Sequence, residues 1–163
     1  MTRLGSGAAA GIEIPIPGVK TLQLRHAVFD FNGTLALDGA LLPGVAPRLR
    51  SLAKLLPLTV LTADTFGTAE AVLRSLPVTV HAVRTGRDKA RLVARWRSAG
   101  VVAIGNGTND APMFRLATLS VAIVGPEGLS SAALRAATVV MPGVTAALDL
   151  LLRSKRASAT LRR

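Results

Sequence analysis

An aspartate follows a short apolar run and precedes a Gly-Thr turn in the segment 29–35 (FDFNGTL). A carboxylate at the carboxyl end of a strand can attack phosphorus, and a turn after it can direct backbone N–H groups toward a phosphate. Asp30 is therefore a candidate nucleophile for phosphoryl transfer. The same residues also fit an ordinary strand that ends in an Asx or glycine turn. This segment alone leaves both interpretations open.

Two further apolar runs end in polar residues of the kind that bind phosphate or metal. The run over 58–62 (LTVLT) ends in Thr62, and the run over 101–105 (VVAIG) leads into the cluster 106–110 (NGTND). Lys89 lies between them, at the start of a predicted helix. A nucleophile, a hydroxyl, a lysine and a metal-binding turn thus follow one another along the chain. Because the ligand crevice of a doubly wound sheet lies at the carboxyl ends of its strands, we expect these groups to converge.

In this order, the motifs resemble those of the haloacid dehalogenase superfamily of phosphotransferases. Thr62-Ala63-Asp64 and the segment 105–110 (GNGTND) most resemble the phosphorylation domain of P-type ATPases, in a free-standing soluble version. The resemblance extends roughly from Arg25 to Leu152 and includes four ordered motifs.

The resemblance implies a role for each matched residue. Asp30 would be the nucleophile and a ligand of Mg²⁺, and Thr62 would bind phosphate, with capping of the strand end as its alternative. Lys89 would offset the charge of the nucleophile and the phosphate, whereas the competing Lys54 has the pattern of a solvated helix residue. Asp64 has two interpretations, a cap of the following helix or a contact in the site.

The resemblance also divides the site into three sets of residues. The expected catalytic residues are Asp30, Asn32, Thr62 and Lys89. The expected phosphate-binding residues are Gly33, Thr34, Thr62, Ala63, Lys89 and Asn109. The expected Mg²⁺ ligands are Asp30, the backbone carbonyl of Asn32, Asn106 and Asp110.

Two residues depart from the family pattern. Asn32 occupies the position where hydrolases of the superfamily usually carry a second aspartate, which protonates the leaving group and later activates water. An amide cannot exchange a proton at neutral pH, so general acid–base help, typically worth about 10²–10⁴-fold, should be missing. Asn106 occupies the position of an aspartate ligand in P-type domains, so metal affinity should fall. Both changes predict a slow or specialised site.

The composition restricts the class of protein. A chain of 163 residues is expected to form one domain, and the absence of cysteine agrees with a reducing, cytoplasmic location. No apolar run reaches the length of a membrane span, which argues against membrane insertion and against a pump. The net charge of +11 is concentrated in Arg84–Arg97 and in the last eleven residues, either as solvated surface or to attract an anionic partner. Aromatic residues for base stacking are scarce, which argues against nucleic acid.

Alternating strand-type and helix-type segments predict an α/β fold, with a three-layer, doubly wound (Rossmann-like) parallel sheet. Asp38-Gly39 predicts a hairpin flap, and the gaps between the motifs leave no room for a cap domain. We expect a flexible N-terminus over 1–11, the phosphotransferase domain over 12–152 and a basic, flexible tail over 153–163. The expected elements are a hairpin over 12–25, strands over His26–Phe31, Leu58–Thr62, Val78–Val83, Val101–Gly105, Leu119–Val124 and Thr138–Met141, and helices over Val45–Leu56, Phe66–Leu76, Arg87–Ala99, Ala111–Leu116, Leu129–Ala136 and Val144–Leu152.

Three functions remain open from the sequence. The first is a Mg²⁺-dependent phosphohydrolase or phosphotransferase that acts on a phosphorylated substrate through Asp30. The second is a catalytically impaired pseudoenzyme that binds phosphate, metal or a partner. The third is an interaction protein whose basic helix and tail bind an anionic partner. The apolar flap segments Leu35–Leu37 and Ala40–Leu42 would leave one face exposed, so we also expect a dimer or tetramer that covers it.

Overall fold

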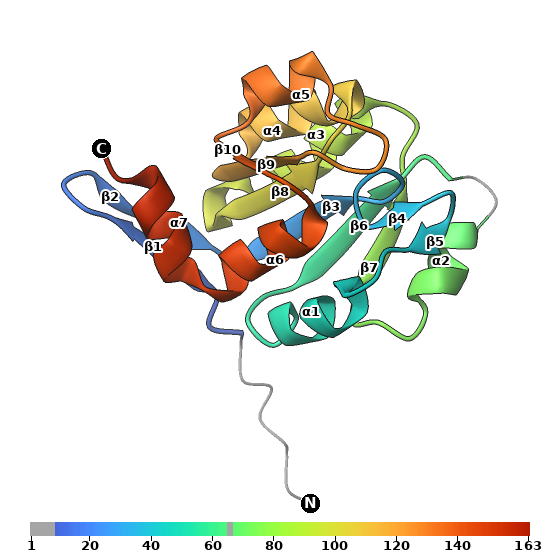
Figure 1. Ribbon diagram of the computed structural model, residues 1–163, viewed down its shortest axis with the longest axis horizontal. Coiled ribbons are helices and arrows are strands. Elements are labelled where there is room, and N and C mark those ends of the chain that lie inside the picture. Colours follow the sequence, from blue (N-terminus) through green and yellow to red (C-terminus); the bar gives the residue numbers. More distant parts are fainter. Residues whose placement is uncertain (1–8, 65–66) are drawn as a thin grey trace, which may run out of the picture.

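The computed structural model describes residues 9–64 and 67–163 and is built around a parallel β-sheet (Figure 1). The six strands lie in the order β10-β9-β8-β3-β6-β7. Strands β6, β8 and β9 are buried along their whole length, as expected of a sheet with helices on both faces. The predicted three-layer, doubly wound fold is confirmed. The strands of the sheet are β3 (His26–Asp30), β6 (Leu58–Thr62), β7 (Thr79–Ala82), β8 (Val101–Gly105), β9 (Leu119–Ile123) and β10 (Val139–Met141).

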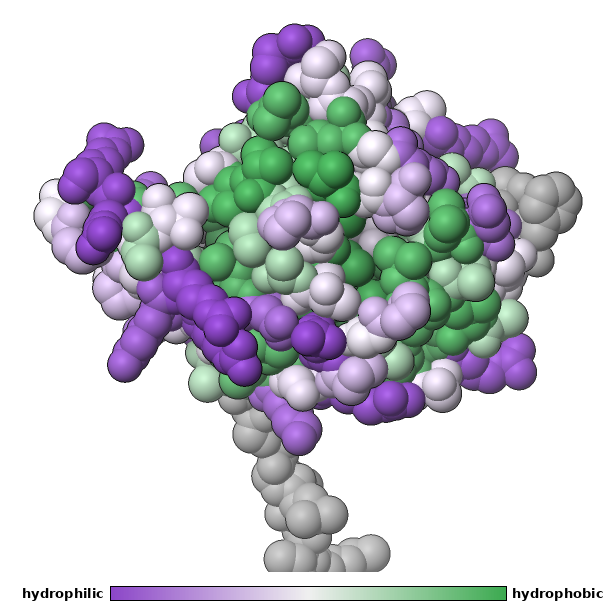
Figure 2. All heavy atoms as spheres, in the orientation of Figure 1, coloured by the Kyte–Doolittle hydropathy of each residue, from purple (hydrophilic) through white to green (hydrophobic). Residues whose placement is uncertain are grey.

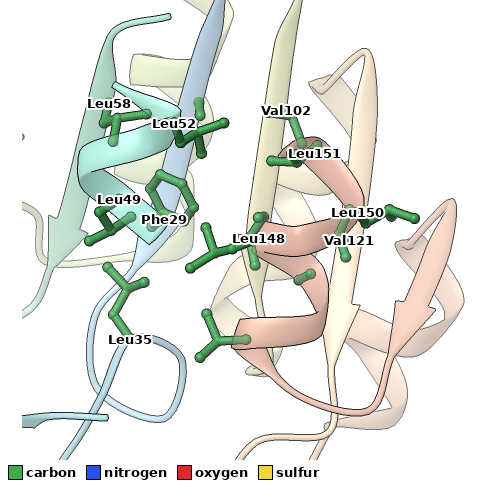
Figure 3. Packing of buried hydrophobic residues seen from close by; sticks show 14 of the residues in the cluster. Phe29, Leu35, Leu49, Leu52, Leu58, Val102, Val121, Leu148, Leu150 and Leu151 are labelled. Carbon is green, nitrogen blue, oxygen red and sulfur yellow. The ribbon is translucent and has the colours of Figure 1, made fainter. Parts of the chain in front are cut away.

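Helices cover the two faces of this sheet. On one face α3 (Gly86–Trp96) packs on α4 (Ala111–Leu116), which packs on α5 (Ser131–Ala136). The other face carries α1 (Val45–Leu52), α2 (Thr68–Leu73) and α6 (Val144–Leu152), which belong to the larger core cluster. Figure 3 shows this core, in which side chains of α1 and α6 meet those of the strands. The labelled residues are Phe29, Leu35, Leu49, Leu52, Leu58, Val102, Val121, Leu148, Leu150 and Leu151.

The chain winds outward from β3 in both directions, which makes the end of β3 the switch point of the sheet. β6 and β7 lie on one side of β3, and β8, β9 and β10 lie on the other. Asp30 pairs with Leu61, and Phe29 pairs with Ile104. The carboxyl ends of β3, β6 and β8 therefore lie side by side at one edge of the sheet. In a doubly wound sheet, this is where ligands bind. The topology therefore places the three predicted motifs together.

Several helix bounds differ from the prediction. α3 ends at Trp96 instead of Ala99, with a 3-10 turn over Arg97–Ala99, and α5 begins at Ser131 instead of Leu129. α1 ends at Leu52 instead of Leu56, and turns lead from it to Pro57. α2 ends at Leu73 instead of Leu76, ahead of Pro77. Proline disfavours the helical conformation only at the residue before it, Leu56 or Leu76. Ahead of that residue the chain forms turns, with the N–H of Leu55 bonded to the carbonyl of Leu52 and the N–H of Leu76 bonded to that of Leu73. The predicted start of α2 at Phe66 lies outside the described residues.

The prediction of a flexible basic tail is wrong for most of the C-terminal segment. Residues Ser154–Leu161 form the helix α7, which packs against β1 (Ile12–Ile16) of the N-terminal hairpin. Ala157 is fully buried there, and Leu161 packs against the core. Figure 2 shows hydrophilic residues over α7, because its basic side chains face solvent. The apolar spacing in this short segment stabilises a helix only once the hairpin is present to cover it.

The structure contains both hairpins that the sequence predicts, one at the N-terminus and one in the flap. β1 pairs with β2 (Lys20–Leu24) as expected, and β4 (Ala36–Leu37) pairs with β5 (Ala40–Leu41) in the flap. However, Leu35 and Ala36 are fully buried in the core of their own chain. Leu41 and Leu42 pack partly against the same core, whereas Leu37 is half-buried and Ala40 is exposed, so the chain itself covers part of the apolar surface of the flap. The oligomeric state stays a prediction.

The N-terminal segment is partly tied to the domain. Residues 1–8 of the expected flexible N-terminus lie outside the described residues. The N–H of Gly11 donates to the carbonyl of Leu55 at 2.8 Å, and the Arg25 side chain donates to the carbonyl of Ala10. Among the residues that the structure describes, no helix combines the length and the apolar character needed to cross a membrane.

Candidate active site

A polar cavity of about 400 Å³ opens at the carboxyl ends of β3, β6 and β8. It brings together residues from all three motifs and one loop that the sequence analysis did not consider. Six residues of the three predicted sets line it, and two carboxylates and a glycine complete its wall. The lining residues are Asp30, Asn32, Thr62, Ala63, Asp64, Asn106, Gly107, Asn109 and Glu127.

Lys89 connects two carboxylates beneath the cavity. Its Nζ donates to Oδ1 of Asp30 at 2.6 Å and to Oδ1 of Asp110 at 2.7 Å. The side chain of Lys89 is 1% exposed and that of Asp110 is 0% exposed, whereas Asp30 keeps 12%. Asp30 is therefore the member of this trio that a ligand can reach. Lys54, the competing lysine, is exposed after α1, so Lys89 is the one of the two that the structure brings to Asp30.

Burial and charge shift the ionisation of this trio. Burial, followed by the nearby charge of Asp110, raises the pKa of Asp30 to about 6, although Lys89 acts in the opposite direction. Burial acts to lower the pKa of Lys89, but Asp30 and Asp110 together outweigh it and raise that pKa above its ordinary value. At neutral pH Lys89 is thus a fixed cation and Asp30 is mostly an anion. This pairing keeps the carboxylate ionised in a buried place.

The first turn of α3 delivers Lys89 to the site. Thr85 caps this helix, because its hydroxyl accepts from the N–H of Asp88 at 3.2 Å and the Asp88 carboxylate accepts from the N–H of Thr85 at 3.0 Å. This reciprocal capping box fixes where the helix begins, at Gly86, one residue before the predicted start. Gly86 also packs so tightly on the backbone of Asn109 that a Cβ there would meet its carbonyl. The helix start and the motif turn are therefore held against each other.

Asp110 is fully buried and is not among the residues that line the cavity, and its predicted role as a metal ligand stays a prediction. Its Oδ2 accepts from the N–H groups of Asn106 at 3.0 Å and Gly107 at 2.9 Å, and its Oδ1 is held by Lys89. Gly105 is required beside it, because a Cβ at that position would overlap the Asp110 carboxylate. Both oxygens are thus engaged in orienting the lysine and the turn.

Gly33 and Thr34 are buried beside Asp30, and their predicted phosphate-binding role stays a prediction. The N–H of Gly33 donates to the carbonyl of Ala36 at 2.7 Å, and the N–H of Thr34 donates to that of Phe31 at 3.1 Å. The buried hydroxyl of Thr34 lies 3.0 Å from Oδ2 of Asp30, within hydrogen-bonding distance. The N–H groups of the turn are therefore bonded within the turn, and the Thr34 hydroxyl contacts Asp30.

The two asparagines that depart from the family pattern both line the cavity. Oδ1 of Asn32 accepts from the N–H of Gly39 in the flap at 3.0 Å, so this amide connects the turn after Asp30 to the flap. Nδ2 of Asn106 donates to the carbonyl of Gly128 at 3.0 Å, and its Oδ1 lies 3.3 Å from the hydroxyl of Thr34. These contacts orient the Asn106 oxygen toward the side of Asp30.

The second motif combines both interpretations of Asp64. The carboxylate of Asp64 accepts from the N–H of Ala69 in the first turn of α2 at 2.9 Å, and the residue also lines the cavity. Its N–H donates to Oγ1 of Thr62 at 3.0 Å. Because a hydroxyl both accepts and donates, Thr62 retains its proton for another acceptor. Ala63 and the exposed Asn109 lie on the cavity wall as expected.

Glu127 is the site residue that the sequence analysis missed. It lies in the loop between β9 and α5, within Gly125-Pro126-Glu127-Gly128, and lines the cavity. The signal was available, because β9 is parallel to β8 and its carboxyl end meets the same edge of the sheet. The other motifs were found as polar residues directly after a strand of the sheet, and the glycine-rich turn with Glu127 after β9 has the same pattern.

Comparison with known sequences gives one relative. No protein-family model matches the chain. An uncharacterized protein of Methanocaldococcus jannaschii is 39% identical over 62 residues, which make up 38% of this chain and 67% of the relative.

Solved structures share the fold at low sequence identity. A zinc-transporting PIB-type ATPase matches with a TM-score of 0.63 and 23% identity over 74% of this chain, which spans 20% of the pump. A HAD-family protein of Streptomyces avermitilis has a TM-score of 0.63 and 22% identity, over 85% of this chain and 87% of its own. The 3-deoxy-D-manno-octulosonate 8-phosphate phosphatase of Moraxella catarrhalis has a TM-score of 0.67 and 12% identity, over 84% and 90%. The chain therefore belongs to the same family as the uncharacterized M. jannaschii protein and has the fold of the haloacid dehalogenase superfamily, with no cap domain among its described residues.

Proposed function

We propose that the protein is a Mg²⁺-dependent phosphotransferase or phosphohydrolase that forms an aspartyl-phosphate on Asp30. The observation that supports this most directly is the ionised carboxylate of Asp30, which opens to the cavity while Lys89 holds it at 2.6 Å from below. A nucleophile of this kind needs to be ionised, oriented and accessible, and Asp30 meets all three requirements. The fold is shared with a phosphatase whose structure contains magnesium and phosphate, which adds support.

The donor groups around the cavity fit a hard divalent cation. Asp30, the carbonyl of Asn32 and the amide oxygen of Asn106 would hold it, and all three are oxygen donors of the type that Mg²⁺ prefers. The hydrogen bond from Nδ2 of Asn106 to Gly128 turns the amide oxygen, not the nitrogen, toward this place. When bound, the cation would offset the negative charge of the phosphoryl group. The amide is a neutral ligand, so we expect modest affinity.

Phosphoryl transfer in this site would proceed in two displacements. In the first, a carboxylate oxygen of Asp30 forms a bond to phosphorus, and the bond from phosphorus to the leaving oxygen breaks, with the electron pair remaining on that oxygen. In the second, the oxygen of water or of another acceptor attacks the same phosphorus and the bond to Asp30 breaks, which regenerates the carboxylate. Thr62 would donate its hydroxyl proton to a phosphoryl oxygen, and Lys89 would balance charge throughout. Positioning and electrostatics carry most of the catalysis in such reactions.

The contacts of Asn32 predict that protonation of the leaving oxygen limits the rate of this site. Its amide oxygen is already bonded to the flap at Gly39, and an amide has no proton to give at neutral pH. The leaving oxygen must then take its proton from water. Substrates with good leaving groups, such as acyl and aryl phosphates, should therefore react faster than alkyl phosphates.

The same contact also favours a second candidate function, a phosphate-binding module with negligible turnover. With Asn32 held by the flap, the site could bind phosphate and metal without completing hydrolysis. The two functions differ in whether Asp30 becomes phosphorylated.

Hydrolysis assays with an aryl phosphate test the proposal. We expect Mg²⁺-dependent release of the phenol by the wild-type protein and none by Asp30→Asn. Asp38→Asn is the matched control, because Asp38 lies in the exposed flap turn with a φ of 49°, a conformation that asparagine tolerates. Equal rates for Asp30→Asn and Asp38→Asn would contradict the proposal.

A further inference from the structure

We infer that Glu127 is a carboxylate ligand of the divalent cation and supplies the charge that an aspartate at position 106 would have provided. This inference rests on the proposed function and adds a ligand from a fourth loop, between β9 and α5. None of the sequence motifs includes this loop.

The atoms close to Gly33 show where the Glu127 carboxylate lies. A Cβ at Gly33 would overlap Oε2 of Glu127, and it would lie 3.0 Å from both amide atoms of Asn106. The carboxylate and the amide therefore share the space above this glycine, next to the nucleophile turn. The φ of Gly33 is 83°, so glycine is required here for its backbone as well as for the room it leaves. The result is a cradle of oxygen atoms from two loops.

The Glu127 loop is fastened on both sides of this cradle. A Cβ at Gly125 would overlap the carbonyl of Gly33, so the two backbones pack directly. The N–H of Gly128 donates to the carbonyl of Gly125 at 2.9 Å, which closes a tight turn with Glu127 inside it. Asn106 then bonds this turn, because its Nδ2 donates to the carbonyl of Gly128 at 3.0 Å. Glu127 itself is exposed, and the turn places its carboxylate on the same side of Gly33 as the Asn106 amide.

The distribution of charge explains why the site needs this carboxylate. Asp110 is fully buried and is not among the residues that line the cavity, and its oxygens bind Lys89 and the turn over 106–107, so a ligand in the cavity does not reach it. Asp64 lines the cavity but also caps α2 through Ala69. Lys89 neutralises much of the charge of Asp30. Without Glu127, a cation would meet the partly neutralised carboxylate of Asp30, the carboxylate of Asp64 that already binds the N–H of Ala69, and neutral oxygens.

Glu127 is the cavity carboxylate with unused capacity. In the part of the chain that the structure describes, no hydrogen bond or ion pair occupies its side chain. Four of the nine acidic residues of this strongly basic chain, Asp30, Asp64, Asp110 and Glu127, gather at this edge of the sheet. Mg²⁺ commonly binds through one or two carboxylates together with water and substrate phosphate. Asp30 and Glu127 provide this pair.

Calorimetric titration with Mg²⁺ and with Mn²⁺, without substrate, tests this assignment. Glu127→Gln keeps the size of the side chain and removes its charge, and we expect it to weaken binding by roughly 10-fold or more, the scale of losses at metal sites. Glu13→Gln is the matched control, because Glu13 is an exposed glutamate of β1 with 60% of its side chain accessible. It should bind the cation like wild type. Thermal unfolding of each variant confirms that it is folded.

A restoring substitution makes the test more specific. Asn106→Asp in the Glu127→Gln background places a carboxylate back in the same cradle, and we expect it to recover most of the lost affinity. Unchanged affinity in Glu127→Gln, with binding lost in Asp30→Asn, would overturn the role of Glu127 and leave the proposed function intact. Unchanged affinity in both variants would overturn the metal site altogether. A loss of turnover in Glu127→Gln with full cation affinity would also overturn the ligand role.

Discussion

Lys89 and Asp30 are 59 residues apart in the sequence, yet their side chains meet at 2.6 Å beneath the cavity. β3 brings the carboxylate to the edge of the sheet, and the capped first turn of α3 brings the lysine to the same point. Lys89 contacts Asp110 as well, so one buried cation separates two carboxylates. The pair therefore has a structural role in the resting protein and an electrostatic role in the proposed reaction.

Removal of the lysine charge should destabilise the fold. In Lys89→Met, Asp30 and Asp110 face each other without a cation, and breaking a buried ion pair in this way typically costs about 3–5 kcal/mol. The loss should be smaller at pH 5 than at pH 7, because a carboxyl that takes up a proton no longer repels its neighbour. Urea denaturation at the two pH values measures this. Lys54→Met, at an exposed position, should change the free energy of unfolding little, and an equal loss in both variants would contradict the account.

The ionisation of Asp30 should make stability depend on pH. Burial and the charge of Asp110 raise its pKa from 3.8 to about 6, so the native state binds a proton more readily than the unfolded state. The free energy of unfolding contributed by this group is therefore highest at acidic pH and falls as the pH rises through that interval. In Asp30→Asn this contribution should disappear. The difference between the two denaturation curves over this range measures it, and parallel curves would show that Asp30 does not titrate there.

Asn32→Asp should increase turnover of the aryl phosphate. The added carboxylic acid can protonate the leaving oxygen, a contribution of about 10²–10⁴-fold in other enzymes. An aspartate oxygen can still accept from the N–H of Gly39, so the flap contact should survive. The gain should be largest for poor leaving groups. Asn32→Ala should give no gain, and intact-mass analysis should exclude deamidation at Asn32-Gly33.

The central part of this site follows from the sequence because each motif ends a strand. The segment over 58–62 and the segment over 101–105 form strands with the predicted ends, and the parallel sheet then brings their polar residues to Asp30. Strand periodicity and turn chemistry are local properties, so the chain itself reveals them.

The contacts of Asp110 and Glu127 and the packing of α7 cannot be predicted from the sequence around each of them. The carboxylate of Asp110 accepts hydrogen bonds from the backbone N–H groups of its own turn and from the Nζ of Lys89. The bond to Lys89 depends on how α3 packs. Glu127 reaches the site through a turn whose position is set by Gly33 and Asn106. α7 forms because β1 is there to cover it. Each of these features depends on contacts between segments that lie far apart in the sequence.

Deletion of residues 154–163 should destabilise the domain rather than remove a free tail. α7 covers β1 and buries Ala157, so its loss exposes apolar side chains such as Ile12 and Ile14. Exposure of one buried aliphatic side chain typically costs about 1.5–3 kcal/mol, and we expect a loss of at least this size. Thermal and urea denaturation measure it. Arg162→Gln with Arg163→Gln removes charge from the exposed end of the segment and should leave stability near wild type.

Fluorine NMR with beryllofluoride and Mg²⁺ tests the central proposal most directly, because beryllofluoride mimics a phosphoryl group on a carboxylate. We predict bound fluorine resonances in the wild-type protein and in Asp38→Asn, and their loss in Asp30→Asn. The Lys89–Asp30 contact supports this expectation, since it orients an ionised oxygen toward the cavity. Bound resonances that persist in Asp30→Asn would contradict the assignment of Asp30 as the phosphoryl acceptor.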